Sequence, residues 1–123
     1  MKQVLLVDKD NLFCQILALV LRWHTDLKEH IEAGSLVEAR RILANSNHKP
    51  DLAIIDADLV NGEGFSLIRE LRASNLDVPV LAITLGRDAE RRERALRAGA
   101  AEVLTMAASP KEISEVAMRL VGE

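Results

Sequence analysis

The stretch from Pro50 to Gly64, PDLAIIDADLVNGEG, decides the fold of this chain. After the proline comes a short apolar run, Leu52 to Ile55, and the run stops at Asp56. It is too short for a helix and is bounded by breakers, so it predicts a strand buried on both faces. Ligands of open parallel sheets bind beyond the carboxyl ends of the strands. We therefore expect Asp56 to be either a functional carboxylate or an ordinary turn residue.

The composition predicts one soluble globular domain over residues 1–123. Of the residues, 49% are hydrophobic and 28% are charged, and the net charge of -3 gives no reason to bind nucleic acid or an anionic membrane. The lone Cys14 excludes an internal disulfide, is expected in the core, and fits a reducing cytoplasm. The longest apolar run, Ile16 to Leu21, is far short of a membrane span, so we expect a cytoplasmic location.

Strand and helix patterns alternate five times along the chain. The predicted strands cover 4–7, 27–33, 52–56, 78–83 and 101–105, and the predicted helices follow them at 13–21, 35–44, 65–71, 88–98 and 113–121. Parallel strands need crossover connections, and these fold back with one handedness. The pattern therefore predicts an α/β fold, a doubly wound five-stranded parallel sheet with helices on both faces.

Three features refine the helices. The first helix should bury the stripe Phe13, Ile16, Leu17, Val20 and Leu21, with Trp23 covering the edge of the core. Ser35 and Ser109 each begin an S-x-x-E capping box, the second with proline at the first helical position. The helix over 88–98 mixes arginine with glutamate, which favours a solvated, salt-bridged face over a nucleic-acid stripe.

Asp8, Asp56 and Thr84 each close a predicted parallel strand, so they should emerge at the same edge of the sheet. Convergent carboxylates and backbone carbonyls suit Mg²⁺, which prefers oxygen ligands and keeps several waters. The cation would screen an incoming phosphoryl group, so that a carboxylate can attack phosphorus and form an aspartyl phosphate. Thr84 would either donate its hydroxyl to a phosphoryl oxygen or serve as a cap or turn residue.

The chain resembles the receiver domain of two-component response regulators over essentially its whole length. The matching segments are VLLVD, PDLAIID with D-x-x-x-x-x-x-x-G, VPVLAIT and ALRAGAAEVL, in that order. The resemblance implies a flavodoxin-like fold with Asp56 as phosphoacceptor and Thr84 as switch hydroxyl. It also implies an Mg²⁺ site made by Asp8, Asp56 and the backbone carbonyl of Asp58.

The same resemblance implies partners. A histidine kinase or a phosphotransfer protein would supply the phosphoryl group, and a C-terminal output domain outside this chain would be typical of the family. A homodimer is a further expectation, with the helix over 88–98 and the final helix as its candidate surfaces. No direct nucleic-acid or membrane binding by this domain is expected.

The chain also departs from the usual receiver pattern around the site. Lys9 replaces the second of two adjacent acids, Met106 and Ala107 replace a lysine and a proline, Val60 replaces a proline, and Leu85 replaces a small residue. A cation 4 Å from another costs roughly 4 kcal/mol at an effective dielectric of 20. Mg²⁺ should therefore bind weakly unless Lys9 turns to solvent or Asp10, one residue along, compensates.

These departures leave two interpretations open. In the first, the chain is a phosphorylatable receiver, which the presence of Asp8, Asp56 and Thr84 favours. In the second, it is a pseudo-receiver, an interaction or dimerisation module in which the Lys9 ammonium pairs with Asp8 or Asp56 and takes part of the cation's place. A flavodoxin-like enzyme or mononucleotide binder is disfavoured, because no glycine-rich turn follows the first strand. We therefore expect a protein that is not an enzyme.

Overall fold

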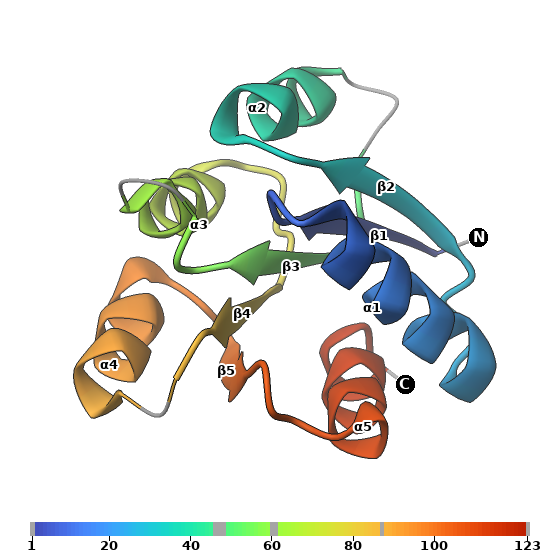
Figure 1. The fold of residues 1–123 in the computed structure, drawn as a ribbon. Coiled ribbons are helices and arrows are strands. Elements are labelled where there is room, and N and C mark those ends of the chain that lie inside the picture. The colour runs from blue at the N-terminus through green and yellow to red at the C-terminus, as the bar shows by residue number, and fades with distance from the viewer. Residues whose placement is uncertain (1, 46–48, 60–61, 87, 123) are drawn as a thin grey trace.

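A computed structural model describes residues 2–45, 49–59, 62–86 and 88–122. Over these residues five parallel strands form one sheet in the order β2-β1-β3-β4-β5 (Figure 1). The strands are β1 (Gln3–Val7), β2 (Glu29–Ala33), β3 (Leu52–Asp56), β4 (Val80–Thr84) and β5 (Glu102–Thr105). The helices are α1 (Asn11–His24), α2 (Leu36–Ala44), α3 (Glu63–Ala73), α4 (Ala89–Ala98) and α5 (Pro110–Leu120). The predicted doubly wound α/β fold is confirmed.

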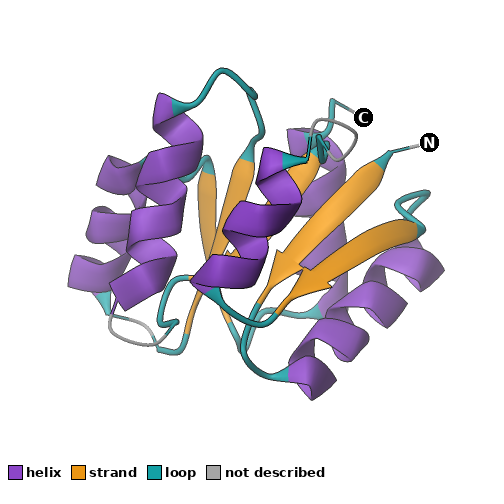
Figure 2. Cartoon of the chain, turned by 90° about the horizontal axis from the view of Figure 1, so that it is seen from above, coloured by secondary structure: helices purple, strands orange, loops and turns teal. Residues whose placement is uncertain are grey.

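The sheet lies between two helical layers, as both Figure 1 and Figure 2 show. One face packs against buried side chains of α2, α3 and α4, and the other packs against α1 and α5. The three central strands, β1, β3 and β4, are apolar on both faces: Leu5 and Ala53 belong to the first core, and Leu6 and Ile54 to the second. This double burial explains why these three strands are continuous apolar runs, whereas the edge strand β2 has the alternating sequence EHIEA.

Three strands begin later than the sequence predicts, the fifth by a single residue, at Glu102 rather than at 101. The second starts at Glu29 rather than at 27, because the buried Leu27 lies in a turn and donates its N–H to the Thr25 hydroxyl at 2.9 Å. The fourth starts at Val80, because Pro79 has no N–H to give to a strand ladder. Pro79 contributes only its carbonyl, which accepts from Ala53 N–H at 3.0 Å.

The outer face of α1 corrects another prediction. Its core-facing residues are Cys14, Leu17 and Leu21, and Ile16 lies on the solvent side instead of in the core. Trp23 is 81% exposed, so it does not cover the edge of the core. The predicted buried stripe was wrong because α1 is apolar around almost its whole circumference. Periodicity alone cannot determine which side of such a helix is buried.

The helix starts agree with the caps expected from the sequence. Ser35 and Ser109 accept the N–H groups of Glu38 and Glu112, both at 3.1 Å, and Pro110 is the first residue of α5. The Glu38 carboxylate returns to the N–H of Gly34 at 3.2 Å, one residue before the cap itself. Such bonds satisfy amides that lack partners within the first turn of a helix.

Candidate functional site

The ends of β1, β3 and β4 place Asp8, Asp56 and Thr84 on neighbouring strands at one edge of the sheet. Asp56 is the last residue of β3, Thr84 is the last residue of β4, and Asp8 directly follows β1. The register aligns Val7 with Ile55 and Asp56 with Ile83, so β3 lies between the other two strands. The structure thus brings together the three strand ends that the sequence analysis singled out.

Asp8 is a buried carboxylate, and its Oδ1 accepts the N–H of Asp10 at 2.9 Å. Burial raises the pKa of Asp8 to about 6, and the charges of Asp56 and Asp10 act in the same direction. The hydrogen bond from Asp10 and the charge of Lys9 oppose this rise. The raised pKa shows that negative charge is costly at this position without a compensating cation.

Asp56 is half-buried, and its Oδ1 accepts the N–H of Asp58 at 2.9 Å. Burial raises its pKa, while the positive charge of Lys9 lowers it. Because Asp56 contributes to the raised pKa of Asp8, the two carboxylates lie close enough to repel one another. A pair of this kind favours a positive ion between or beside its members.

Thr84 is buried, and its hydroxyl donates to the carbonyl of Gly86 at 3.1 Å. Its own carbonyl accepts the N–H of Met106 at 3.0 Å, which joins the end of β4 to the residue after β5. In this conformation the Thr84 hydroxyl therefore closes a turn in the loop between β4 and α4. A switch role would require the hydroxyl to exchange this partner.

Asp58 makes a contact that the sequence analysis missed. One oxygen of its carboxylate accepts the N–H of Leu85 at 2.7 Å, and the other forms an ion pair with Arg91 of α4. Asp58 thus ties the loop after β3 to the loop after β4. No motif signals this contact, since it depends on two loops that are distant in sequence but adjacent in the fold.

The substituted positions that the structure describes lie around this edge. Lys9 is exposed, and over the described ranges it forms no ion pair, although its charge lowers the pKa of both Asp8 and Asp56. Asp10 is the N-cap of α1: its Oδ1 accepts from Leu12 and Phe13 at 3.0 and 3.2 Å. Compensation of Lys9 by Asp10 therefore competes with this cap. Val60 lies outside the described residues.

The donor set fits a cation that keeps most of its water. Over the part of the chain that the structure describes, no three His, Cys, Asp or Glu residues form a cluster that could hold a metal. Asp8 and Asp56 remain as two carboxylates at one edge, and Mg²⁺ is commonly held by one or two carboxylates together with waters. The side chain of Asp58 is already occupied by Leu85 and Arg91.

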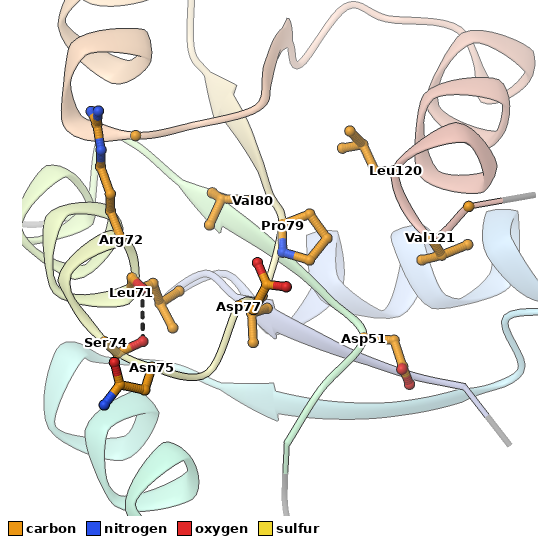
Figure 3. A pocket seen from close by; sticks show the side chains of 13 residues that line it. Asp51, Leu71, Arg72, Ser74, Asn75, Asp77, Pro79, Val80, Leu120 and Val121 are labelled. Carbon is orange, nitrogen blue, oxygen red and sulfur yellow. Dashed lines mark hydrogen bonds between the residues drawn. The ribbon is translucent and has the colours of Figure 1, made fainter.

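Two cavities lie at opposite edges of the sheet. One, of about 490 Å³, lies beside the site and is lined by Asp58, Leu85, Arg91 and Arg94 among others. A larger one, of about 670 Å³, lies at the amino ends of β3 and β4, where Asp51, Asp77 and Pro79 surround it (Figure 3). In a parallel sheet the carboxyl ends carry the ligand site, so the larger cavity is not assigned to it.

Comparison with known proteins agrees with this geometry. The model of the response regulator receiver domain family matches residues 4–118, and the chain belongs to this family. These are domains of two-component signalling, generally without catalytic activity of their own.

Curated relatives match part of the chain. It is 36% identical over 75 residues to the virulence transcriptional regulatory protein PhoP of Salmonella choleraesuis, and 35% identical over 75 residues to the transcriptional regulatory protein PhoP of Escherichia coli. Each match covers 61% of this chain and 32% of the relative. The matched region is thus about a third of the length of these relatives.

Solved structures match the whole fold. A response regulator receiver protein from Burkholderia phymatum is 27% identical with a TM-score of 0.87, and the match covers 99% of this chain and 96% of that one. A response regulator from Thermotoga maritima has a TM-score of 0.87 at 21% identity, covering 100% and 99% of the two chains. At that lower identity the likeness concerns the fold alone. Among the described helices, none has the length and apolarity needed to cross a membrane.

Proposed function

We propose that this chain accepts a phosphoryl group on Asp56 from a histidine kinase or a phosphotransfer protein and transmits the change to a partner or output domain. The observation that carries this proposal is the placement of Asp56 at the end of β3, between strands that end at Asp8 and Thr84. Family membership supports the signalling class, and Asp8, Asp56 and Thr84 stand at the positions to which the resemblance assigns metal binding, phosphoryl acceptance and switching.

The chemistry is a transfer between two side chains. A carboxylate oxygen of Asp56 forms a bond to phosphorus while the bond from phosphorus to the donor nitrogen breaks, and the freed imidazole takes up a proton. Receiver domains typically bind Mg²⁺ at this site, where the ion supplies charge neutralisation for the phosphoryl oxygens. Asp8, Asp56 and the backbone carbonyl of Asp58 would hold it.

Thr84 and the Asp58 contact would carry the change outward. If the Thr84 hydroxyl leaves the Gly86 carbonyl for a phosphoryl oxygen, the loop between β4 and α4 must rearrange. That loop is fastened to Asp58 through Leu85, and α4 is fastened to it through Arg91. Rearrangement at Thr84 would therefore reach α4 and the neighbouring β5.

Intact mass spectrometry tests the proposal. The protein is incubated with a small-molecule phosphodonor and Mg²⁺, beside an Asp56→Asn control, and circular dichroism establishes that both are folded. Gain of one phosphoryl group by the parent chain alone is the expected result. A folded parent chain that gains none would overturn it.

A second candidate function is a pseudo-receiver, and Lys9 and Met106 favour it. Lys9 lowers the pKa of both Asp8 and Asp56, which is the direction expected of a cation that partly replaces Mg²⁺. Met106 offers no positive charge to a phosphoryl group. In this function the chain would act as a constitutive interaction or dimerisation module.

The output and location also belong to the proposal. The relatives named PhoP are transcriptional regulators about three times as long as the matched region, which supports a C-terminal output domain beyond this chain. A homodimer, a single receiver domain over 1–123 and a cytoplasmic location stay predictions from the sequence.

A further inference from the structure

Helix α1 presents apolar side chains to solvent along its whole length. Four of them lie on the side away from the core: Leu12 is 64% exposed, Ile16 47%, Leu19 52% and Trp23 81%. We call these four residues the α1 stripe. They make up four of the seven exposed large hydrophobic residues found over the described ranges, and no other helix there carries more than one. A helix that is apolar all round is normally covered on both sides.

The spacing of the stripe is that of a coiled-coil seam. The steps from Leu12 to Ile16, to Leu19 and to Trp23 are four, three and four residues, which places all four on one narrow line along the helix. The opposite side of the same helix, with Cys14, Leu17 and Leu21, faces the sheet. The stripe is therefore ready to pack against a second helix.

The stripe is complementary to itself when two copies run antiparallel. In a twofold pair, if residue i of one copy contacts residue j of the other, then residue j of the first copy contacts residue i of the second. Along two antiparallel helices the residue number rises in one as it falls in the other, so the two residue numbers of each contact add up to the same value. Leu12 then lies opposite Trp23, and Ile16 lies opposite Leu19, with no apolar residue left unmatched. The seam forms two kinds of layer, each occurring twice around the twofold axis.

The charges beside the stripe agree with self-association. Helix α1 contains no acidic residue, and Arg22 is its one permanently charged side chain. In the antiparallel pair Arg22 would lie beside Gln15 of the second copy, so like charges do not meet. The helix thus has no charge pattern that would select a differently charged partner.

We propose that the α1 stripe is the interface of a weak, antiparallel homodimer of this chain. The eight side chains of two stripes offer on the order of 1,000 Å² of apolar surface, which is near the lower bound for a specific interface. The dimer is therefore concentration-dependent. It does not rest on phosphorylation of Asp56, and it uses a different surface from α4 and α5, the helices expected from the family resemblance.

Sedimentation over protein concentrations from about 1 µM to about 1 mM, without phosphodonor, tests the interface. The expected mass rises from one chain to two, and emission of the chain's single tryptophan, Trp23, shifts to shorter wavelength as it is covered. Ile16→Lys or Leu19→Glu alone should weaken association by about 100-fold or more, because each leaves an unpaired charge in the seam. Val37→Glu, at an exposed apolar residue of α2, is the matched control and should leave the dimer intact.

Mixing the two charged variants tests the direction of the helices. In the antiparallel pair, Lys at 16 of one copy faces Glu at 19 of the other, so the mixture should recover association that neither variant shows alone. No recovery would overturn the antiparallel register. A parent chain that stays monomeric throughout would overturn the dimer, including in the case where the stripe proves to bind a histidine kinase instead.

Discussion

At the scale of single residues, the balance of charge around Asp8 and Asp56 decides how the site treats a cation. The double variant Lys9→Asp with Met106→Lys restores the residue types that are usual in receiver domains at both positions. It places a carboxylate beside Asp8 and a positive charge after the end of β5. We expect Mg²⁺ affinity to rise by about tenfold, less than the unscreened Coulomb energy because Lys9 is exposed. Calorimetric titration with Mg²⁺ measures the change.

Lys28→Gln is the matched control for that exchange, since the double variant and this control each lower the net charge by one unit. Lys28 is also exposed, but it precedes β2 at the opposite edge of the sheet, so the same change of net charge lies far from the two carboxylates. If the control variant increases Mg²⁺ affinity by the same factor, the effect comes from net charge. The hypothesis that Lys9 weakens Mg²⁺ binding locally would then be wrong.

Asp8 also predicts a pH dependence of folding stability in the absence of metal. Its pKa rises from 3.8 to about 6 on folding, so between these values the folded state binds more protons than the unfolded state. The free energy of unfolding must then fall as pH rises through this window. Asp8→Asn removes this decrease because asparagine does not ionise. We therefore expect the free energy of unfolding at neutral pH to be about 2 to 3 kcal/mol higher than in the parent chain. Denaturant unfolding at several pH values measures it.

The control for Asp8 is Asp26→Asn, because Asp26 is an exposed acid after the end of α1. This variant should keep the pH dependence of the parent chain. If the Asp8→Asn variant retains the same slope between pH 4 and pH 6, burial of Asp8 is not the source of that slope.

At the scale of elements, the start of α3 depends on a glycine. A Cβ atom at Gly64 would overlap the carbonyl oxygen of Asp56, so the first turn of α3 can approach the end of β3 only without a side chain. Gly64→Ala should lower the free energy of unfolding by about 1 to 3 kcal/mol and displace Asp56. Gly86→Ala is the control, because no atom lies within 4 Å of a Cβ built there. Thermal unfolding of both variants decides the matter.

The elements also show what sequence alone can reach. Apolar runs and helix caps predicted the alternating strands and helices, and the strand ends then placed Asp8, Asp56 and Thr84 at one edge, because a parallel sheet fixes where its strands finish. The contact of Asp58 with Arg91 could not be predicted from the sequence, because it depends on how the loops after β3 and β4 meet in space. The side chain of Asp58 was consequently unassigned.

The side of α1 that packs against the sheet was predicted wrongly for a different reason. Its sequence contains two apolar stripes, and the choice between them depends on how the helix is rotated against the sheet. The prediction placed Ile16 in the core, whereas the structure buries Cys14 with Leu17 and Leu21. Periodicity describes a helix correctly but leaves its rotation open when polar residues are scarce.

At the scale of the whole molecule, Asp56, the proposed phosphoacceptor, and the proposed dimer seam are separate. Asp56 lies at the carboxyl end of β3, the central strand of the sheet. The α1 stripe lies on the solvent side of the helical layer formed by α1 and α5. No described hydrogen bond or ion pair joins Asp56 to a stripe residue. Each function should therefore survive loss of the other.

A pair of crossed measurements makes this separation testable. Ile16→Lys should abolish the dimer in sedimentation and still gain one phosphoryl group in intact mass, while Asp56→Asn should do the reverse. Both substitutions preserve the buried packing, because Ile16 faces solvent and asparagine matches the shape of aspartate. If Ile16→Lys also prevents phosphorylation while remaining folded, the two surfaces are coupled through α1 and the loop at Asp8. Independence would instead mean that association and phosphorylation reach an output by different faces of the same sheet.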